Sequence, residues 1–248
     1  LAGDVSDETL VAIKELKWSE IENWKAKELF EREATILSHL DHPGIPRFLN
    51  SFEEGESFYL VQEFIEGKSI QQLLDAGHPW PQKAIMRLMV DVLEILVYLH
   101  SFSPPILHRD VKPANIILHP DGRFVLVDFG GVQITVSKDV GNSTIVGSAG
   151  YMPLEQLQGR TVPASDLYSL AATIVHVATK TEPIDLEVVR GSLQFESLVD
   201  LPDEAVNALR QALSPVVEDR LQTVEEFRRA LLRRKRKPAE IQGLVAEV

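Results

Sequence analysis

The stretch from Leu107 to Gly130 constrains the fold of this chain more than any other part. It reads LHRDVKPANIILHPDGRFVLVDFG, and two apolar, β-prone runs, Ile116–Leu118 and Phe124–Val127, flank Asp121-Gly122. An Asp-Gly pair between such runs is a strong hairpin signal, because glycine accepts the positive φ that a tight turn requires. The sequence therefore predicts an antiparallel hairpin in the middle of the chain.

The predicted hairpin brings polar residues to one point. Asn115 directly precedes its first strand, Asp128 follows its second strand, and Asp110 lies in the loop that leads into it. Antiparallel strands joined by a tight turn place their outer ends side by side. Carboxylates and an amide that converge in this way favour a Mg²⁺ and phosphate site over a hydrophobic core, because Mg²⁺ prefers oxygen ligands.

The composition limits the classes of function. The chain has 248 residues, of which 44% are hydrophobic and 25% charged, as in ordinary globular proteins. Its net charge of −12 argues against nucleic acid as the main partner, since phosphate neutralisation needs a basic surface. The absence of cysteine excludes disulfides and thiolate metal sites, and it fits a reducing compartment.

We predict no membrane segment in this sequence and a cytoplasmic location. The longest nearly apolar stretch, Leu167–Thr179, is too short to span a bilayer, and no signal peptide opens the chain. The sequence starts at Leu1 rather than at methionine, so we expect a fragment. An alternative is that it forms the cytoplasmic domain of a larger or membrane-anchored protein. We interpret the basic run over 233–237 as a solvated helix end, with a juxtamembrane segment or a nucleic-acid contact as alternatives.

The hydrophobic pattern divides the chain into a strand-rich first part and a helix-rich second part. In the first part we expect one helix over 19–40 and strands over 10–14, 46–52 and 57–64. In the second part we expect a long loop over 131–149 and helices over 69–76, 82–101, 167–180, 203–213 and 223–232. These patterns predict an N-lobe over 1–65, a C-lobe over 66–232 and a basic tail over 233–248.

Several motifs occur along the chain in a fixed order. They are Val11-Ala12-Ile13-Lys14, Glu33 on a helix, His108-Arg109-Asp110, Lys112 with Asn115, Asp128-Phe129-Gly130, and Pro153-Leu154-Glu155. In this order, and on these predicted elements, they resemble the eukaryotic-like protein kinases, most closely their bacterial Ser/Thr branch. The resemblance implies an α+β, bilobal protein-kinase-like fold, with a small β-rich N-lobe carrying one long helix and a larger α-helical C-lobe.

The resemblance also implies a protein serine/threonine kinase, which transfers the γ-phosphoryl group of ATP to a Ser or Thr hydroxyl of protein substrates. Lys14 would hold the α- and β-phosphates and pair with Glu33. Asp128 would ligate the Mg²⁺ ion that bridges the phosphates, and Asn115 would ligate a second ion.

The same resemblance assigns separate roles around the loop. Asp110 would accept the proton of the acceptor hydroxyl or orient that hydroxyl, and Lys112 would stabilise the transferring phosphoryl group. We interpret His108 as a packing residue rather than a base, in a column with Phe129, Leu37 and Phe48.

For the adenine ring, the resemblance implies a hinge after a polar gatekeeper, Gln62. Backbone groups of Glu63 and Ile65 would bind the edge of the ring, while the side chains of Ala12 and Ile117 would cover its two faces. Plain core packing is a compatible interpretation of the last two side chains.

Further residues would support the site without touching the reacting atoms. Glu155 would pair with Arg220, Asp166 would brace the backbone of the catalytic loop, and Ser148 would contact Asp110.

Arg109, which precedes Asp110, implies regulation by phosphorylation of the 131–149 loop. The candidates for self-phosphorylation are Thr135, Ser137, Ser143 and Thr144. The alternative is a loop that orders without phosphate.

The chain departs from the family pattern upstream of Lys14, where no glycine-rich phosphate loop is present. We expect that the sequence is truncated at its N-terminal end, so that the first strand and this loop are missing from it. The alternatives are a pseudokinase, acting as a nucleotide-binding or scaffold module, and a small-molecule phosphotransferase. Lys112, the 147–155 segment and Arg220 argue against the latter, because they resemble a platform for peptide substrates.

Overall fold

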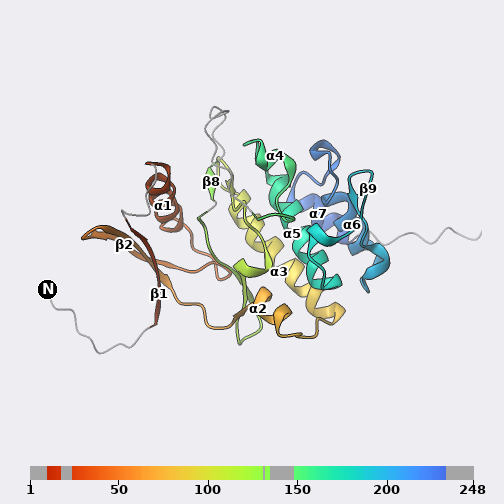
Figure 1. Ribbon diagram of the computed structural model, residues 1–248, viewed down its shortest axis with the longest axis horizontal. Coiled ribbons are helices and arrows are strands. Elements are labelled where there is room, and N and C mark those ends of the chain that lie inside the picture. The colour runs from red at the N-terminus through yellow and green to blue at the C-terminus, as the bar shows by residue number, and fades with distance from the viewer. Residues whose placement is uncertain (1–9, 18–23, 131, 135–147, 233–248) are drawn as a thin grey trace, which may run out of the picture.

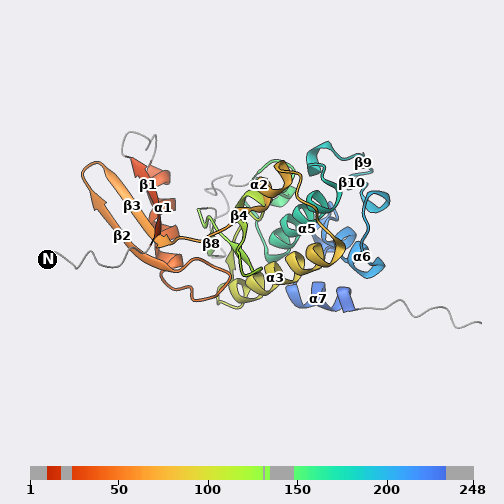
Figure 2. The ribbon, with the colours of Figure 1, turned by 90° about the horizontal axis from the view of Figure 1, so that it is seen from below.

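The computed structural model describes residues 10–17, 24–130, 132–134 and 148–232. Figures 1 and 2 show a small sheet with one helix at one end of the molecule and a group of helices at the other. The fold is therefore the predicted mixture of a small β-rich lobe and a larger helical lobe.

The small lobe is an antiparallel sheet of β1 (Val11–Lys17), β3 (Ser57–Glu63) and β2 (Phe48–Glu54), in that spatial order. Along β1 the residues alternate between exposed and half-buried, as expected of a strand with one covered face. This alternation puts Ala12 and Lys14 on the covered face. The helix α1 (Trp24–Leu37) packs on the sheet, with the rings of Phe30 and Phe58 6.5 Å apart.

The large lobe is built around α5 (Pro163–Thr179), which is buried on nearly all sides because its sequence is apolar nearly all round. The wide apolar face of α3 (Gln82–His100) belongs to the same core, as do residues of α6 (Asp203–Ala212) and α7 (Val224–Leu232). The shorter helices in this lobe are α2 (Ile70–Asp75) and α4 (Leu154–Leu157), and the 3₁₀ turns are η2 (Pro113–Asn115), η3 (Pro183–Asp185), η4 (Glu196–Leu198) and η5 (Val217–Asp219).

The predicted hairpin lies between the two lobes. Its strands, β6 (Ile116–Leu118) and β7 (Phe124–Leu126), pair antiparallel, and Gly122 in the turn has φ of +89°. The short strand β4 (Lys68–Ser69) extends this sheet on the side of β6. The hairpin prediction is therefore confirmed.

Two local predictions need correction. The expected continuous loop over 131–149 is interrupted by β8 (Gln133–Ile134), which pairs with β5 (Ile106–Leu107). A second short hairpin, β9 (Val188–Val189) with β10 (Ser192–Leu193), was not predicted. Strands of two residues depend on a partner distant in sequence rather than on local hydrophobic spacing, so the pattern alone did not reveal them. The lobe boundary at 65/66 stays a prediction, and the 233–248 tail lies outside the described residues.

Candidate active site

The predicted ion pair of Lys14 and Glu33 is present. The Lys14 ammonium on β1 lies 2.7 Å and 3.0 Å from the two carboxylate oxygens of Glu33 on α1, and 3.1 Å from one oxygen of Asp128. The carboxylate of Glu33 is 3% exposed, whereas the side chains of Lys14 and Asp128 are 41% and 48% exposed. This cluster links the small lobe to the end of the hairpin and still opens to solvent.

Gly130 has a steric role beside this cluster. A Cβ atom at Gly130 would lie 2.9 Å from the Lys14 nitrogen, and the Gly130 N–H donates to Asp128 at 3.3 Å. Glycine therefore leaves room for the ammonium between its two carboxylate partners.

The charges in the cluster depend on each other. Burial opposes the charge of Lys14, but Glu33 and Asp128 outweigh burial and raise the pKa of Lys14. Burial also opposes ionisation of Asp128, yet Lys14 and the Gly130 N–H lower the pKa of this carboxyl. For Glu33, burial raises the pKa and Lys14 opposes that rise. We assign Glu33 as ionised, because both of its oxygens accept from the ammonium.

Asp110 is the centre of a second polar cluster. Its carboxylate oxygens lie 2.8 Å from the Lys112 ammonium, 2.9 Å from the Asn115 amide nitrogen and 3.1 Å from the Ser148 hydroxyl. Lys112 also donates to the Ser148 hydroxyl at 2.7 Å. The predicted contact between Ser148 and Asp110 is confirmed, and the carboxylate is held by donors on several sides.

The hairpin connects the two clusters. The backbone N–H of Val127, the residue before Asp128, donates to the Asn115 carbonyl at 2.8 Å. The Asn115 amide nitrogen is turned toward Asp110, which leaves its side-chain oxygen free to act as a ligand. Arg109 and Asp128, which flank the site, have positive φ values of 69° and 63°. Such backbone strain in residues other than glycine persists only where the surrounding structure enforces it.

Asp166, a fully buried carboxylate on α5, provides this enforcement as predicted. It accepts the backbone N–H groups of His108 at 3.0 Å and Arg109 at 2.8 Å. It also bonds to the His100 ring at 2.9 Å. Burial opposes its charge, but the bond to His100 and the bond from the Arg109 N–H lower the pKa of Asp166. The catalytic-loop backbone is therefore tied to the most buried helix.

Two contacts around the loop were not predicted from the sequence. These are the bond from His100 to Asp166 and a 2.6 Å bond from the Gln156 amide to the Arg109 carbonyl. Neither His100 nor Gln156 is itself a motif residue, although Gln156 directly follows Glu155, so only the fold shows that they reach the loop.

His108 packs as predicted. Its ring is completely buried and lies 4.8 Å from the ring of Phe129 in an edge-on arrangement. Burial lowers the pKa of His108. Leu37 and Phe129 belong to the hydrophobic core, and Phe48 packs against it. The stacked column of all four side chains stays a prediction.

The Glu155–Arg220 pair is also present, deep in the large lobe. The Arg220 guanidinium donates to both oxygens of Glu155, at 2.6 Å and 3.1 Å, and stacks over the Tyr168 ring at 4.7 Å. Glu155 also accepts the Ser165 hydroxyl at 2.7 Å.

The residues predicted to surround adenine lie where the lobes join. Ala12 and Gln62 are cross-strand neighbours in β1 and β3. Glu63 ends β3, Ile65 follows it with its side chain buried, and Ile117 lies in β6. Their contact with adenine stays a prediction.

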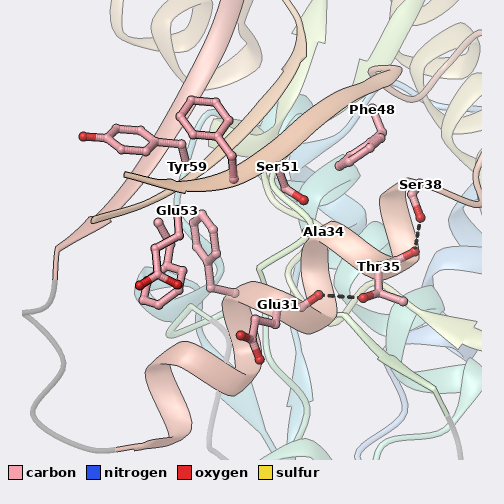
Figure 3. A pocket seen from close by; sticks show the side chains of 11 residues that line it. Glu31, Ala34, Thr35, Ser38, Phe48, Ser51, Glu53 and Tyr59 are labelled. Carbon is pink, nitrogen blue, oxygen red and sulfur yellow. Dashed lines mark hydrogen bonds between the residues drawn. The ribbon is translucent and has the colours of Figure 1, made fainter. Parts of the chain in front are cut away.

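A separate cavity of about 550 Å³ lies on another side of α1, between this helix and strands β2 and β3 (Figure 3). Figure 3 shows Glu31, Ala34 and Thr35 of α1 facing Phe48 and Ser51 of the sheet. Phe48, which was predicted for the column with His108, lines this cavity, whereas the residues predicted to bind ATP, metal or substrate do not.

Comparison with known proteins decides the family. Residues 2–237 match the family described as protein kinase domain. The chain belongs to the protein kinase family. This confirms the resemblance and the fold class, and members of this family use ATP and a divalent metal.

Several relatives of this kinase domain are bacterial serine/threonine-protein kinases. It is 33% identical over 234 residues to serine/threonine-protein kinase B of Synechocystis sp., covering 89% of this chain and 40% of that protein. It is 42% identical over 170 residues to serine/threonine-protein kinase PknA of Nostoc sp., covering 65% of this chain and 30% of that protein. It is 30% identical over 189 residues to serine/threonine-protein kinase PrkC of Bacillus subtilis, covering 75% of this chain and 29% of that protein. The chain thus spans less than half the length of these relatives.

In the described part of this kinase domain, no helix combines the length and the apolar character that crossing a membrane requires. The candidate phosphorylation sites Thr135, Ser137, Ser143 and Thr144 lie outside the described residues.

Proposed function

We propose that this chain is the catalytic domain of a protein serine/threonine kinase. The observation that carries the proposal is the Asp110 carboxylate, which lies within hydrogen-bond distance of Lys112, Asn115 and Ser148. A carboxylate held by donors on several sides can orient an acceptor hydroxyl with little rearrangement. The serine/threonine kinase names of the bacterial relatives support the same activity.

The phosphate end of the site uses the Lys14 cluster. The Lys14 ammonium would bind the α- and β-phosphates of ATP, held in position by the buried Glu33. Asp128 would hold one Mg²⁺ ion and the side-chain oxygen of Asn115 a second ion, because Mg²⁺ is bound by few protein oxygens together with substrate phosphates. When bound, the metal neutralises phosphate charge.

The acceptor end of the site uses the Asp110 cluster. The Ser or Thr oxygen of the substrate would attack the γ-phosphorus while the bond from this phosphorus to the ADP oxygen breaks. Asp110 would orient the hydroxyl and take its proton. Lys112, 2.8 Å from Asp110, would stabilise the negative charge of the transferring group.

The adenine ring would lie between Ala12 and Ile117, next to Gln62, with its edge bound by backbone groups of Glu63 and Ile65.

We also propose self-phosphorylation in the 131–149 loop. We further propose cytoplasmic protein substrates, because the reaction needs a supply of ATP. Phosphopeptide mapping of the active protein tests the loop, and an active protein without loop phosphate would contradict that part.

Phosphate transfer by the full-length protein, compared with its Asp110→Asn variant, tests the function. The variant keeps the shape of the side chain and should lose about 10²-fold to 10⁴-fold in kcat, the contribution of a positioned proton acceptor. Equal transfer by both proteins would rule out the proposal and favour a pseudokinase. Because the named relatives are serine/threonine kinases, that alternative is not favoured.

A further inference from the structure

The side chain of Gln156 on α4 holds a peptide of the catalytic loop, and nothing in the proposed chemistry uses it. This side chain is fully buried, and its amide nitrogen donates to the Arg109 carbonyl at 2.6 Å. The carbonyl belongs to the peptide that joins Arg109 to Asp110. We propose that Gln156 is a positioning residue for Asp110, which sets the orientation of the proton acceptor without touching the substrate. The proposal rests on the kinase function proposed above.

The peptide between Arg109 and Asp110 is held at both of its polar ends. Its oxygen accepts from Gln156, and its N–H, which belongs to Asp110, donates to Nδ1 of the His108 ring at 3.3 Å. Because a peptide is planar, holding these two ends fixes the plane from which the Asp110 side chain extends. A rotation of this plane would swing the Asp110 carboxylate away from the acceptor hydroxyl.

The backbone at this point depends on its surroundings. Arg109 has a φ of +69°, which residues other than glycine adopt rarely and only where neighbouring groups enforce it. Asp166 accepts the Arg109 N–H at 2.8 Å, while Gln156 donates to the carbonyl of the same residue. Asp166 therefore fixes the peptide that leads into Arg109, whereas Gln156 fixes the peptide that leads into Asp110.

The next two carbonyls of the loop have other donors. The Asp110 carbonyl accepts the Asn115 amide at 2.9 Å, and the Val111 carbonyl accepts the Thr173 hydroxyl at 3.1 Å. Both bonds lie on the C-terminal side of the Asp110 Cα atom. They cannot replace the bond from Gln156, which lies on its N-terminal side.

Gln156 also belongs to a segment that contacts the Asp110 side chain. At the start of this segment, the Ser148 hydroxyl lies 3.1 Å from the Asp110 carboxylate. Directly before Gln156, Glu155 pairs with the buried Arg220 and anchors α4 in the large lobe. The 148–156 segment thus contacts Asp110 through its carboxylate and through the peptide that precedes it, and the large lobe supports the second contact.

The contact requires a donor at position 156. A backbone carbonyl can only accept, so its partner must supply an N–H or O–H group. Methionine has a similar length but no donor, and it would leave the buried carbonyl without this bond. Glutamate has the shape of glutamine but donates only when its carboxyl is protonated. These two replacements therefore test the bond rather than the volume of the side chain.

Steady-state kinetics of phosphate transfer by the full-length protein test the proposal. Gln156→Met should lower kcat about tenfold to 10²-fold, since small misplacements of a reacting group reduce rates strongly. The KM for ATP should change less than about twofold, because the Lys14 cluster is not altered.

The matched control is Gln222→Met. Gln222 is exposed, follows η5, and donates its amide to the carbonyls of Val217 and Arg220 at 2.7 Å and 2.9 Å. This variant loses the same kind of bond and should keep the kcat of the unmodified protein.

The pH profile of Gln156→Glu separates positioning from a merely structural role. At about pH 8 the ionised carboxylate cannot donate, and kcat should lie about 10²-fold below that of the unmodified protein at the same pH. Burial favours the neutral carboxyl, so the side chain should take up a proton as the pH falls to about 6 and donate to the carbonyl again. The ratio of variant to unmodified kcat should then rise about tenfold, while the ratio for Gln156→Met should stay constant. If Gln156→Met does not fold, the profile of Gln156→Glu decides alone.

Amide hydrogen exchange of the 107–112 segment reports on the loop without transfer, so the two proposals fail separately. Exchange should be faster in Gln156→Met and unchanged in Gln222→Met. Faster exchange in a protein without transfer activity supports the positioning role and overturns the kinase function. An active protein in which Gln156→Met keeps its kcat, or in which the Gln156→Glu ratio does not change with pH, overturns the positioning role and leaves the function standing. Unchanged exchange in Gln156→Met also overturns it.

Discussion

Among the ion pairs that join a basic residue to a glutamate, one in the small lobe and one in the large lobe have very different surroundings. In the small lobe, Lys14 is 41% exposed and shares its ammonium between Glu33 and Asp128. In the large lobe, the Arg220 side chain is 1% exposed and its donors are taken by Glu155 and by backbone carbonyls, including that of Ser214 at 2.7 Å. A cation that solvent reaches can exchange one carboxylate for a phosphate, whereas a buried cation with its donors occupied can only hold the scaffold.

The largest expected effect breaks the buried pair. Arg220→Met leaves Glu155 buried without its partner and should lower the free energy of unfolding by about 3–5 kcal/mol. Urea unfolding measures this change. The matched control is Arg228→Met, because Arg228 and its partner Glu94 are 50% and 45% exposed. That variant should lose less than about 1 kcal/mol, and equal losses would show that burial does not distinguish the pairs.

The second prediction breaks the exposed pair. Lys14→Met should lower phosphate transfer about 10²-fold to 10³-fold, as expected when a group that stabilises developing charge is removed. Burial already raises the pKa of Glu33, and without Lys14 this carboxyl can take up a proton. The loss of unfolding free energy should therefore stay near about 1–2 kcal/mol. Kinetics and urea unfolding of one preparation separate the two effects, and a loss as large as that of Arg220→Met would contradict the comparison.

A third, smaller effect should follow from Gly130. The Gly130→Ala methyl group would lie 2.9 Å from the Lys14 nitrogen and 3.3 Å from an Asp128 oxygen, which are the ends of side chains that can shift, so the free energy of unfolding should change by less than about 0.5 kcal/mol. The displaced ammonium should nevertheless lower transfer about tenfold, since small misplacements reduce rates strongly. Unchanged kinetics would show that the close approach of Gly130 to Lys14 has no functional role.

The pH dependence of stability sharpens the comparison from the buried side. Burial depresses the pKa of His108, so below the unfolded value of about 6.5 only the unfolded chain takes up the proton readily. Stability should therefore be fully present above this pH and fall as the pH decreases through the window below it. The lowered pKa of Asp166 extends the loss below about pH 4, where this carboxyl takes up a proton in the unfolded chain while it is still ionised in the folded protein. Urea midpoints between pH 8 and 5 should fall less steeply for His108→Asn than for the unmodified protein, and equal slopes would contradict this assignment.

Much of the architecture follows from local patterns. Short β-prone, apolar runs predicted the strands of the small lobe, and a run that is apolar nearly all round predicted the buried helix α5. Such patterns predict structure because an element at the edge of the core buries one apolar face, and a central helix buries its whole surface. The strand β8 (Gln133–Ile134), which interrupts the predicted loop, shows the limit of local patterns. This strand forms because the backbone of Ile106–Leu107 pairs with it.

The sequence by itself determined which groups enter the candidate site, because the order of the motifs and the Asp-Gly turn place Asp110, Asn115 and Asp128 within one hairpin. Only the tertiary structure decided the environment of each charge. It brought His100 and Asp166 to the backbone of the catalytic loop and left Lys14 reachable while burying Arg220. The burial of a charge and its partners depend on segments that are distant in sequence. The hydrophobic spacing within one segment therefore cannot predict them.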